Sequence, residues 1–208
     1  MNLVVPLKRL TAAKSRLAER AGSGELRSAL ALAMAMDTVA AALATPAVRR
    51  VLVAAADPTE LGALRELGAE VVFDGGESGL NAGLRHVARQ VRAEDPDCVV
   101  GALQAVLPAL RPDDLAAAIA ASGARRAFCA DRAGTGTTLL LSAPAGELDP
   151  HFGPGSARAH TESGAAPVEL TVPTLRADVD TPDDLAHVQL LGVGEHTRAA
   201  LQTRARAC

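Results

Sequence analysis

The chain has 208 residues, which suits a single α/β domain, and its hydrophobic fraction of 49% allows a sizeable core. The formal net charge of −3 argues against a surface that binds duplex nucleic acid, because such a surface must neutralise phosphates. With 1% aromatic residues and neither Trp nor Tyr, the sequence also lacks the stacking groups of single-strand binders, so we expect no nucleic-acid partner.

Cysteine usage and apolar runs indicate the compartment. Cys98, Cys129 and Cys208 are widely spaced and match no metal-ligand or redox motif, so we expect reduced thiols. The apolar run at the N-terminus is too short for a signal peptide, and no stretch approaches the ~20 apolar residues of a membrane span. We therefore expect a cytoplasmic protein with no membrane partner.

The first part of the chain alternates between short apolar runs and segments of helical spacing. A buried first strand is predicted at Asn2–Pro6, where Pro6 ends the run. Further strands are predicted at Val51–Ala55, Glu70–Phe73 and Asp97–Leu103, and helices at Glu25–Leu43, Thr59–Leu67, Leu80–Val91 and Pro112–Ala121. This alternation indicates βαβ units and a mainly parallel sheet. The Ala-rich helix could lie in a core or at a homodimer interface.

After Arg126 the pattern becomes richer in strands. They are predicted at Arg126–Ala130, Thr137–Ser142, Val168–Val172 and Leu175–Val179, with a short helix after Pro154 and another at Thr181–Leu191. We expect this part to add a small antiparallel extension to the sheet. No linker is long enough to divide the chain, so we expect one domain, residues 1–208, with a core at about 2–194 and a helical or frayed tail at 195–208.

The stretch LRADVDTPDDL, residues 175–185, carries paired carboxylates. At the end of a predicted strand, Asp178 and Asp180 would leave the same face, roughly 6.6 Å apart along the chain, close enough to flank one divalent ion. Thr181 suits an N-cap and Pro182 a first helical position, which explains Asp183 and Asp184 as first-turn acids. Turn chemistry could also account for the first pair.

Several loops would meet beyond the carboxyl ends of the strands, where ligands bind in open α/β sheets. The loop after the first strand carries Lys8, Lys14 and Arg16, whose cations suit phosphate oxygens, although a solvated basic loop has the same composition. Asn81, at the start of a predicted helix, could read a base edge or cap a turn.

Two glycine-rich stretches extend this set of loops. In Gly134–Thr138 the glycines allow close approach to an anion and the threonines add hydroxyl donors, but a tight turn explains the glycines equally well. Phe152–Ser156 could leave backbone N–H groups facing an anion. We expect His151 and His160 at the surface rather than as ligands. Neither stretch matches the Walker A or G-x-G-x-x-G patterns.

Six blocks of the sequence are informative together: PLKRLTAAKSRL (6–17), MDTVAAAL (36–43), LQAVLPALRPDDL (103–115), GTGTTLL (134–140), HFGPGSARAH (151–160) and DVDTPDDL (178–185). With these blocks the chain resembles the 2-phospho-L-lactate guanylyltransferase family. That family includes the phosphoenolpyruvate guanylyltransferases that make the activated precursor of the deazaflavin coenzyme F-420. The resemblance runs in order from about Asn2 to Gly194.

The resemblance implies a Rossmann-like three-layer nucleotidyltransferase fold, shared with glycosyltransferase-A enzymes. The expected reaction transfers GMP from GTP to phosphoenolpyruvate or 2-phospho-L-lactate and releases pyrophosphate, by positioning and charge neutralisation. The implied site consists of catalytic cations Lys8, Lys14 and Arg16, with Lys8 on the acceptor and the other two near the triphosphate; Thr138, Gly153 and Ser156 on the acceptor phosphate; Asn81 near the guanine; and Asp178 and Asp180 on Mg²⁺.

One position departs from the family pattern. The family has an aspartate directly before LPAL, whereas this chain has Val106, which supplies neither charge nor lone pair. Asp178 and Asp180 would then hold Mg²⁺ more weakly, with Asp131 the nearest substitute by loop position. The rival hypotheses are a catalytically silent nucleotide-binding homologue and a nucleotidyltransferase that acts on another acceptor, such as a molybdopterin or a sugar phosphate. The sequence leaves 3-phosphoglycerate open as an acceptor too.

Overall fold

A computed structural model describes residues 1–7, 24–76 and 79–207. Its strands are β1 (Asn2–Pro6), β2 (Arg50–Ala55), β3 (Glu70–Phe73), β4 (Val100–Leu103), β5 (Ala127–Ala130), β6 (Thr137–Leu141) and β7 (Ala166–Pro167). Its helices are α2 (Gly24–Leu43), η3 (Pro58–Glu60), α3 (Gly62–Glu66), α4 (Leu80–Glu94), α5 (Pro112–Ala121), α6 (Ser156–Glu162), α7 (Pro182–Leu191) and α8 (Glu195–Ala207). The predicted cations Lys8, Lys14 and Arg16 lie outside the described residues.

The strands form one mixed sheet in the order β3-β2-β1-β4-β6-β5-β7. The pairs among β3, β2, β1 and β4 are parallel, while β6 runs antiparallel to both β4 and β5. This arrangement confirms the predicted parallel sheet with a small antiparallel extension.

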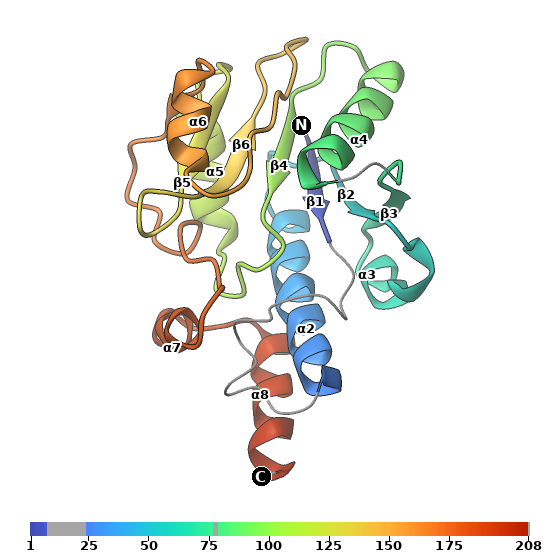
Figure 1. The fold of residues 1–208 in the computed structure, drawn as a ribbon, viewed down its shortest axis with the longest axis vertical. Helices are drawn as coiled ribbons and strands as arrows, with labels where there is room; N and C mark the ends of the chain where they lie inside the picture. The colour runs from blue at the N-terminus through green and yellow to red at the C-terminus, as the bar shows by residue number, and fades with distance from the viewer. Residues whose placement is uncertain (8–23, 77–78, 208) are drawn as a thin grey trace.

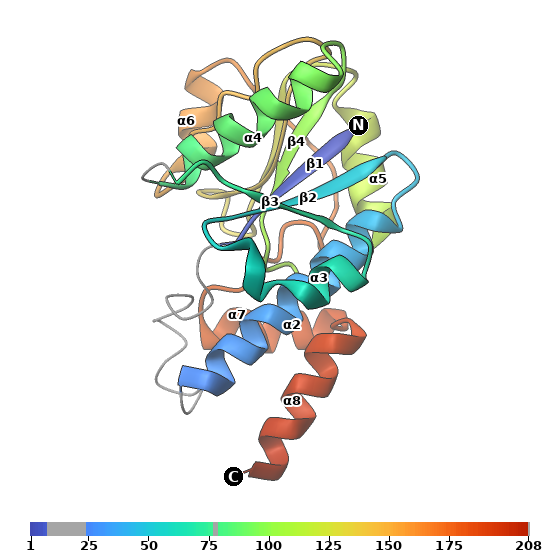
Figure 2. The same ribbon diagram turned by 90° about the vertical axis from the view of Figure 1, so that its right-hand side faces the viewer.

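Helices cover both faces of the sheet, which makes three layers (Figure 1 and Figure 2). Successive residues of a strand point to opposite faces, so the β1 side chains divide between two cores. Leu3 and Val5 pack with α2, α3 and α5 on one face. Val4 packs with α4 and α6 on the other. Because both faces are buried, β1 and β2 read as continuous apolar runs.

Within the described residues, α2 is the one helix that is long and apolar enough to span a membrane by length and composition. The expectation that no stretch approaches such a span is therefore wrong for Leu26–Leu43, with a mean hydropathy of 1.5. Half of this segment is buried inside the fold, where it packs against β2 and α8. The core helix of a soluble protein passes the same test.

Three predicted elements differ from the structure, two strands and one helix. The strands expected at Val168–Val172 and Leu175–Val179 do not form, and the last strand is the two-residue β7. The chain turns instead, because the N–H groups of Leu175 and Arg176 both donate to Val172 O and Pro173 has no N–H for a ladder. The single helix expected at Thr59–Leu67 is divided into η3 and α3.

The residues expected to form a tail fold into α8, which packs on α2. Asp37 of α2 fixes this contact, because its carboxylate accepts the N–H of His196 at 3.0 Å and of Thr197 at 2.8 Å. Both groups belong to the first turn of α8, whose N–H groups have no partner within the helix. A side chain on Gly194 would collide with the Asp37 carboxylate, so the approach of α8 requires glycine there.

We predict that Asp37→Ala lowers the free energy of unfolding by about 2 kcal/mol, because it removes a helix cap and leaves a buried N–H unpaired. The measurement is the urea midpoint of the purified protein. Asp113→Ala, which removes an exposed first-turn carboxylate from α5, serves as the control and should cost about 0.5 kcal/mol or less. Equal losses in the two variants would contradict the capping role.

Candidate functional site

The candidate residues gather at the carboxyl edge of the parallel strands. β4 ends there at Leu103, and its antiparallel partner β6 begins there, since Leu103 pairs with Leu139. β5 runs in the same direction as β4, because both are antiparallel to β6. The turn between β5 and β6 therefore lies at the edge where β4 leads into the loop that carries Val106.

The backbone around Val106 is held from both sides. Thr38 of α2, which is fully buried, shares its hydroxyl proton between Met34 O at 2.9 Å and Ala105 O at 3.1 Å, and it accepts the N–H of Leu107 at 2.9 Å. Val106 O accepts the N–H of Val179 at 3.0 Å. The structure thus brings the backbone at position 106 next to Val179, which Asp178 and Asp180 flank. Because the strand predicted at Leu175–Val179 does not form, strand alternation does not place these two carboxylates on one face. The Val106 side chain itself packs against the core cluster between α2 and α7.

The acidic residues after Asp180 have a structural function. Thr181 is the N-cap of α7, as the sequence predicted, and it forms a reciprocal capping box with Asp184 that was not predicted. Asp184 also accepts hydrogen bonds from the N–H of Asp180 and from Arg132. Burial alone would raise the pKa of the Asp184 carboxyl, but the hydrogen bonds from Thr181, Asp180 and Arg132 outweigh it and lower that pKa. Asp184 is therefore an ionised cap.

A metal site would have few protein ligands. Among the described residues, no group of three or more His, Cys, Asp or Glu side chains could hold an ion. The suggested substitute, Asp131, accepts the N–H of Thr135 at 2.9 Å, and its backbone carbonyl accepts two hydrogen bonds from Arg176. The hydrogen bond from Thr135 makes the Asp131 carboxylate part of the tight β5–β6 turn. Of the two explanations for the glycines in this stretch, a tight turn or an approaching anion, the turn is the simpler.

The two threonines at the start of β6 point to opposite faces of the sheet. Thr138 is fully buried and donates its hydroxyl to Cys129 O at 3.4 Å. Thr137 lies on the other face, where its hydroxyl oxygen is 3.1 Å from Ser156 Oγ. The structure therefore joins Ser156 with Thr137 rather than with the predicted Thr138. Strand alternation was the signal that could have separated the two.

The loop before α6 contains Gly153 and Gly155 on either side of Pro154. Their φ angles are +145° and +73°, backbone conformations that side-chain-bearing residues rarely adopt. Gly155 is the N-cap of α6, and Ser156 is its first residue. The N–H of Ser156 donates to Gly153 O at 3.1 Å, which closes a turn. Glycine at both positions is thus a requirement of the turn that presents Ser156.

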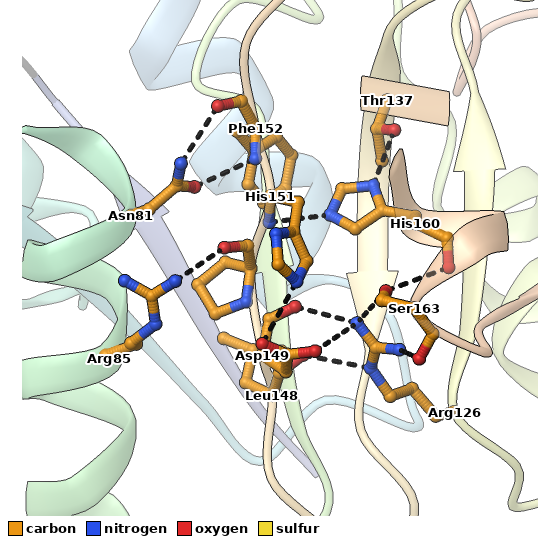
Figure 3. A network of polar contacts seen from close by, with 11 residues as sticks. Asn81, Arg85, Arg126, Thr137, Leu148, Asp149, His151, Phe152, His160 and Ser163 are labelled. Atoms are coloured by element: carbon orange, nitrogen blue, oxygen red, sulfur yellow. Dashed lines mark hydrogen bonds and ion pairs between the residues drawn. The ribbon is translucent and has the colours of Figure 1, made fainter. Parts of the chain in front are cut away.

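Side chains from neighbouring elements hold the backbone just before this turn (Figure 3). Asn81 of α4 donates to Phe152 O at 2.9 Å and accepts the N–H of Phe152 at 2.8 Å. Arg85, one turn further along α4, donates to Pro150 O. Arg126 donates to the carbonyls of Leu148 and Asp149. The Asn81 side chain, expected near a guanine base, therefore connects the start of α4 to the glycine-rich loop.

The expectation that His160 lies at the surface is wrong. It is fully buried on α6, where its ring lies 5.7 Å from Phe128 and 5.2 Å from Phe152 between ring centres. Nδ1 lies 2.9 Å from Thr137 Oγ1, and Nε2 accepts the N–H of His151 at 3.0 Å. Burial, reinforced by Arg126 and His151, lowers the pKa of His160 to about 4, although Asp149 acts in the opposite direction. The sequence offered one signal that His160 has a role, its position inside the HFGPGSARAH block.

Comparisons with known proteins agree with this architecture. Residues 1–205 match the family model described as "Guanylyl transferase CofC like". Phosphoenolpyruvate guanylyltransferase of Streptomyces scabiei is 52% identical over 204 residues, which cover 95% of this chain and 94% of that protein. The Streptomyces avermitilis protein of the same name is 54% identical over 200 residues, with coverages of 95% and 92%. A nucleotidyl transferase structure from Methanothermobacter thermautotroptrophicus has a TM-score of 0.56 at 19% identity, covering 97% and 98% of the two chains, and shares the fold.

Asn81→Asp tests the connection between α4 and the loop. We expect it to lower the free energy of unfolding by about 1–2 kcal/mol, because a carboxylate oxygen then replaces the donor that faces Phe152 O. Gln90→Glu makes the same chemical change at an exposed position of α4 and should cost about 0.5 kcal/mol or less. Urea midpoints of both variants decide; an unchanged midpoint for Asn81→Asp would argue against the connection.

The low pKa of His160 predicts a pH-dependent stability. His160 has an ordinary pKa of 6.5 in the unfolded chain and one of about 4 in the fold, so between these values only the unfolded chain binds the proton. The free energy of unfolding should therefore fall as the pH drops from 6.5 towards 4, and His160→Gln should lack this contribution. Urea unfolding of both proteins from about pH 7 to about pH 4.5 measures it, since other groups cancel in the difference. A difference independent of pH would contradict the prediction.

Proposed function

This chain belongs to the guanylyl transferase CofC-like family, and from that premise we propose that it transfers GMP from GTP to phosphoenolpyruvate. The observation that carries the proposal is its identity of 52% to a phosphoenolpyruvate guanylyltransferase over nearly the whole of both chains. The alternative, a catalytically silent homologue, is not favoured, because its sole support is one residue. The proposal extends to a step in the biosynthesis of the deazaflavin coenzyme.

In the proposed reaction, a phosphate oxygen of phosphoenolpyruvate attacks the α-phosphorus of GTP. A new P–O–P bond forms, the bond between the α-phosphorus and the β-phosphate oxygen breaks, and pyrophosphate leaves with that electron pair. No proton transfer to carbon is needed, so the protein acts by positioning and by neutralising charge. We assign the cations to Lys8, Lys14 and Arg16, and the acceptor phosphate to the turn that contains Gly153 and Ser156 at the edge of β6. Thr138 does not offer its hydroxyl to that phosphate, because the side chain is buried and donates to Cys129 O.

Mg²⁺ is part of the proposal. Mg²⁺ takes oxygen ligands and is commonly held by one or two carboxylates together with substrate phosphates. Asp178 and Asp180, beside Val106, fit such a shared site, although they do not make an all-protein cage. A bound Mg²⁺ would neutralise charge on the triphosphate and on the leaving pyrophosphate. The role of the chain itself is to fix the two carboxylates, through the hydrogen bond from Val179 to Val106 and the capped start of α7.

A reducing compartment fits the proposed enzyme. Cys98 and Cys129 are free thiols, and Cys129 is buried, where burial raises the pKa of its thiol. A neutral, buried thiol is chemically inert, which is usual for cysteines of cytoplasmic proteins. We propose a cytoplasmic location on this basis.

The proposal predicts a gain of function at position 106. We expect slow pyrophosphate release from GTP, phosphoenolpyruvate and Mg²⁺ by the chain itself, and at least about a tenfold faster rate in Val106→Asp, equivalent to about 1.4 kcal/mol of barrier. The reason is that the aspartate restores a metal-binding carboxylate beside Asp178 and Asp180. A coupled pyrophosphate assay measures both rates.

Val106→Asn is the matched control, because it has the size and polarity of the aspartate without its charge. It should remain as slow as the unchanged chain. Equal rates for the chain and Val106→Asp would show that position 106 is not a needed ligand. Pyrophosphate release by neither protein, with GTP still bound, would favour the silent homologue.

A further inference from the structure

We propose that His160 is a positioning residue for the acceptor phosphate, acting through the hydroxyls of Thr137 and Ser156. The inference rests on the proposed function, since Ser156 is assigned to that phosphate there. His160 touches no reacting group itself. It connects the backbone before the glycine-rich turn, at His151, with the hydroxyl of Thr137 (Figure 3), which in turn is paired with Ser156.

The hydrogen bonds of His160 determine where its proton lies. The backbone N–H of His151 can only donate, so Nε2, which lies 3.0 Å away, must be the unprotonated acceptor. In a neutral ring the proton is then on Nδ1, which lies 2.9 Å from Thr137 Oγ1 and donates to it. The ring therefore has one fixed tautomer and one fixed direction.

A series of hydrogen bonds can run from His160 through the hydroxyls of Thr137 and Ser156 to a bound anion, with the same donor direction throughout. In the free protein Ser156 donates to Thr137. Because Thr137 already accepts from His160, it can turn its own proton towards Ser156 Oγ. Ser156 can then point its proton out of the pair, towards a phosphate oxygen. In this series of bonds each group accepts one hydrogen bond and donates the next, and such bonds polarise one another.

The surroundings keep the ring neutral and in place. Among the described residues, Arg126, Asp149 and His151 are the charged or titratable groups that act on it, and burial together with Arg126 and His151 disfavours a second proton. Protonation would also put an N–H on Nε2, directly opposite the N–H of His151. The rings of Phe128 and Phe152 also pack against it. If the side chain at position 160 only filled space, it would need neither of the two ring nitrogens, yet both have a hydrogen-bond partner.

Two substitutions separate the two hydrogen bonds. In His160→Gln the amide oxygen can still accept the His151 N–H at the place of Nε2, but nothing donates to Thr137. In His160→Asn the amide nitrogen can take the place of Nδ1 and donate to Thr137, while the His151 N–H loses its partner. We expect His160→Gln to weaken phosphoenolpyruvate binding about tenfold and His160→Asn to weaken it about threefold or less. The probe is phosphoenolpyruvate with Mg²⁺, titrated by calorimetry.

GTP affinity and a second variant provide the controls. Both substitutions should leave the Kd of GTP unchanged, which a general loss of structure would not. Thr137→Val removes the middle hydroxyl at nearly constant volume and should match His160→Gln, and the double variant should bind no more weakly than either single one. Nitrogen NMR of the imidazole should show a protonated Nδ1 in the unchanged chain.

The outcomes are decisive in either direction. The inference is overturned if His160→Gln binds phosphoenolpyruvate as the unchanged chain does, if the two losses are additive, or if Nε2 carries the proton. It is also overturned if the unchanged chain binds no phosphoenolpyruvate. If the chain binds phosphoenolpyruvate and His160→Gln weakens that binding, but Val106→Asp releases no pyrophosphate, the positioning role stands while the proposed transfer reaction fails.

Discussion

The structure depends on one constraint, the need to satisfy buried backbone groups in loops that have no strand partner. At the carboxyl edge of the sheet the chain leaves the ladder several times, and at several of these points a side chain replaces the missing backbone partner. Thr38 does so around position 106, Asp131 in the β5–β6 turn, and Asn81 and His160 before the glycine-rich turn. Hydrogen bonds are directional, so they hold each loop in one conformation, which apolar packing alone would not do.

The same bonds explain how segments far apart in sequence form one site. α2 holds the loop after β4, that loop accepts the N–H of Val179, and the start of α7 is capped directly after Asp180. On the other side, α4 and α6 hold the backbone that leads to Gly153. The proposed metal site and the proposed acceptor site thus share the edge of β4 and β6. Transfer of a nucleotidyl group between two bound substrates requires a fixed distance between their binding regions, because the protein acts by positioning and by charge.

The backbone on either side of Val106 is held by hydrogen bonds from distant elements. Its carbonyl accepts the N–H of Val179, and its side chain packs against the apolar cluster between α2 and α7. The capping residues of α7 and the hydroxyl of Thr38 satisfy backbone groups, so their role in the fold does not depend on a bound ion. The framework around the proposed metal site is therefore part of the fold itself.

The sequence by itself determined the elements whose cause is local. Apolar runs predicted β1 to β4, helical spacing predicted α2, α4 and α5, and Thr181 with Pro182 predicted the start of α7. It also carried the family resemblance that the comparisons support. Only the tertiary structure decided which polar groups meet. It turned Thr137 rather than Thr138 towards Ser156, buried His160, joined Asn81 to Phe152, and replaced the late strands with a turn. These outcomes depend on partners that are distant in sequence, and no local pattern encodes the position of a distant partner.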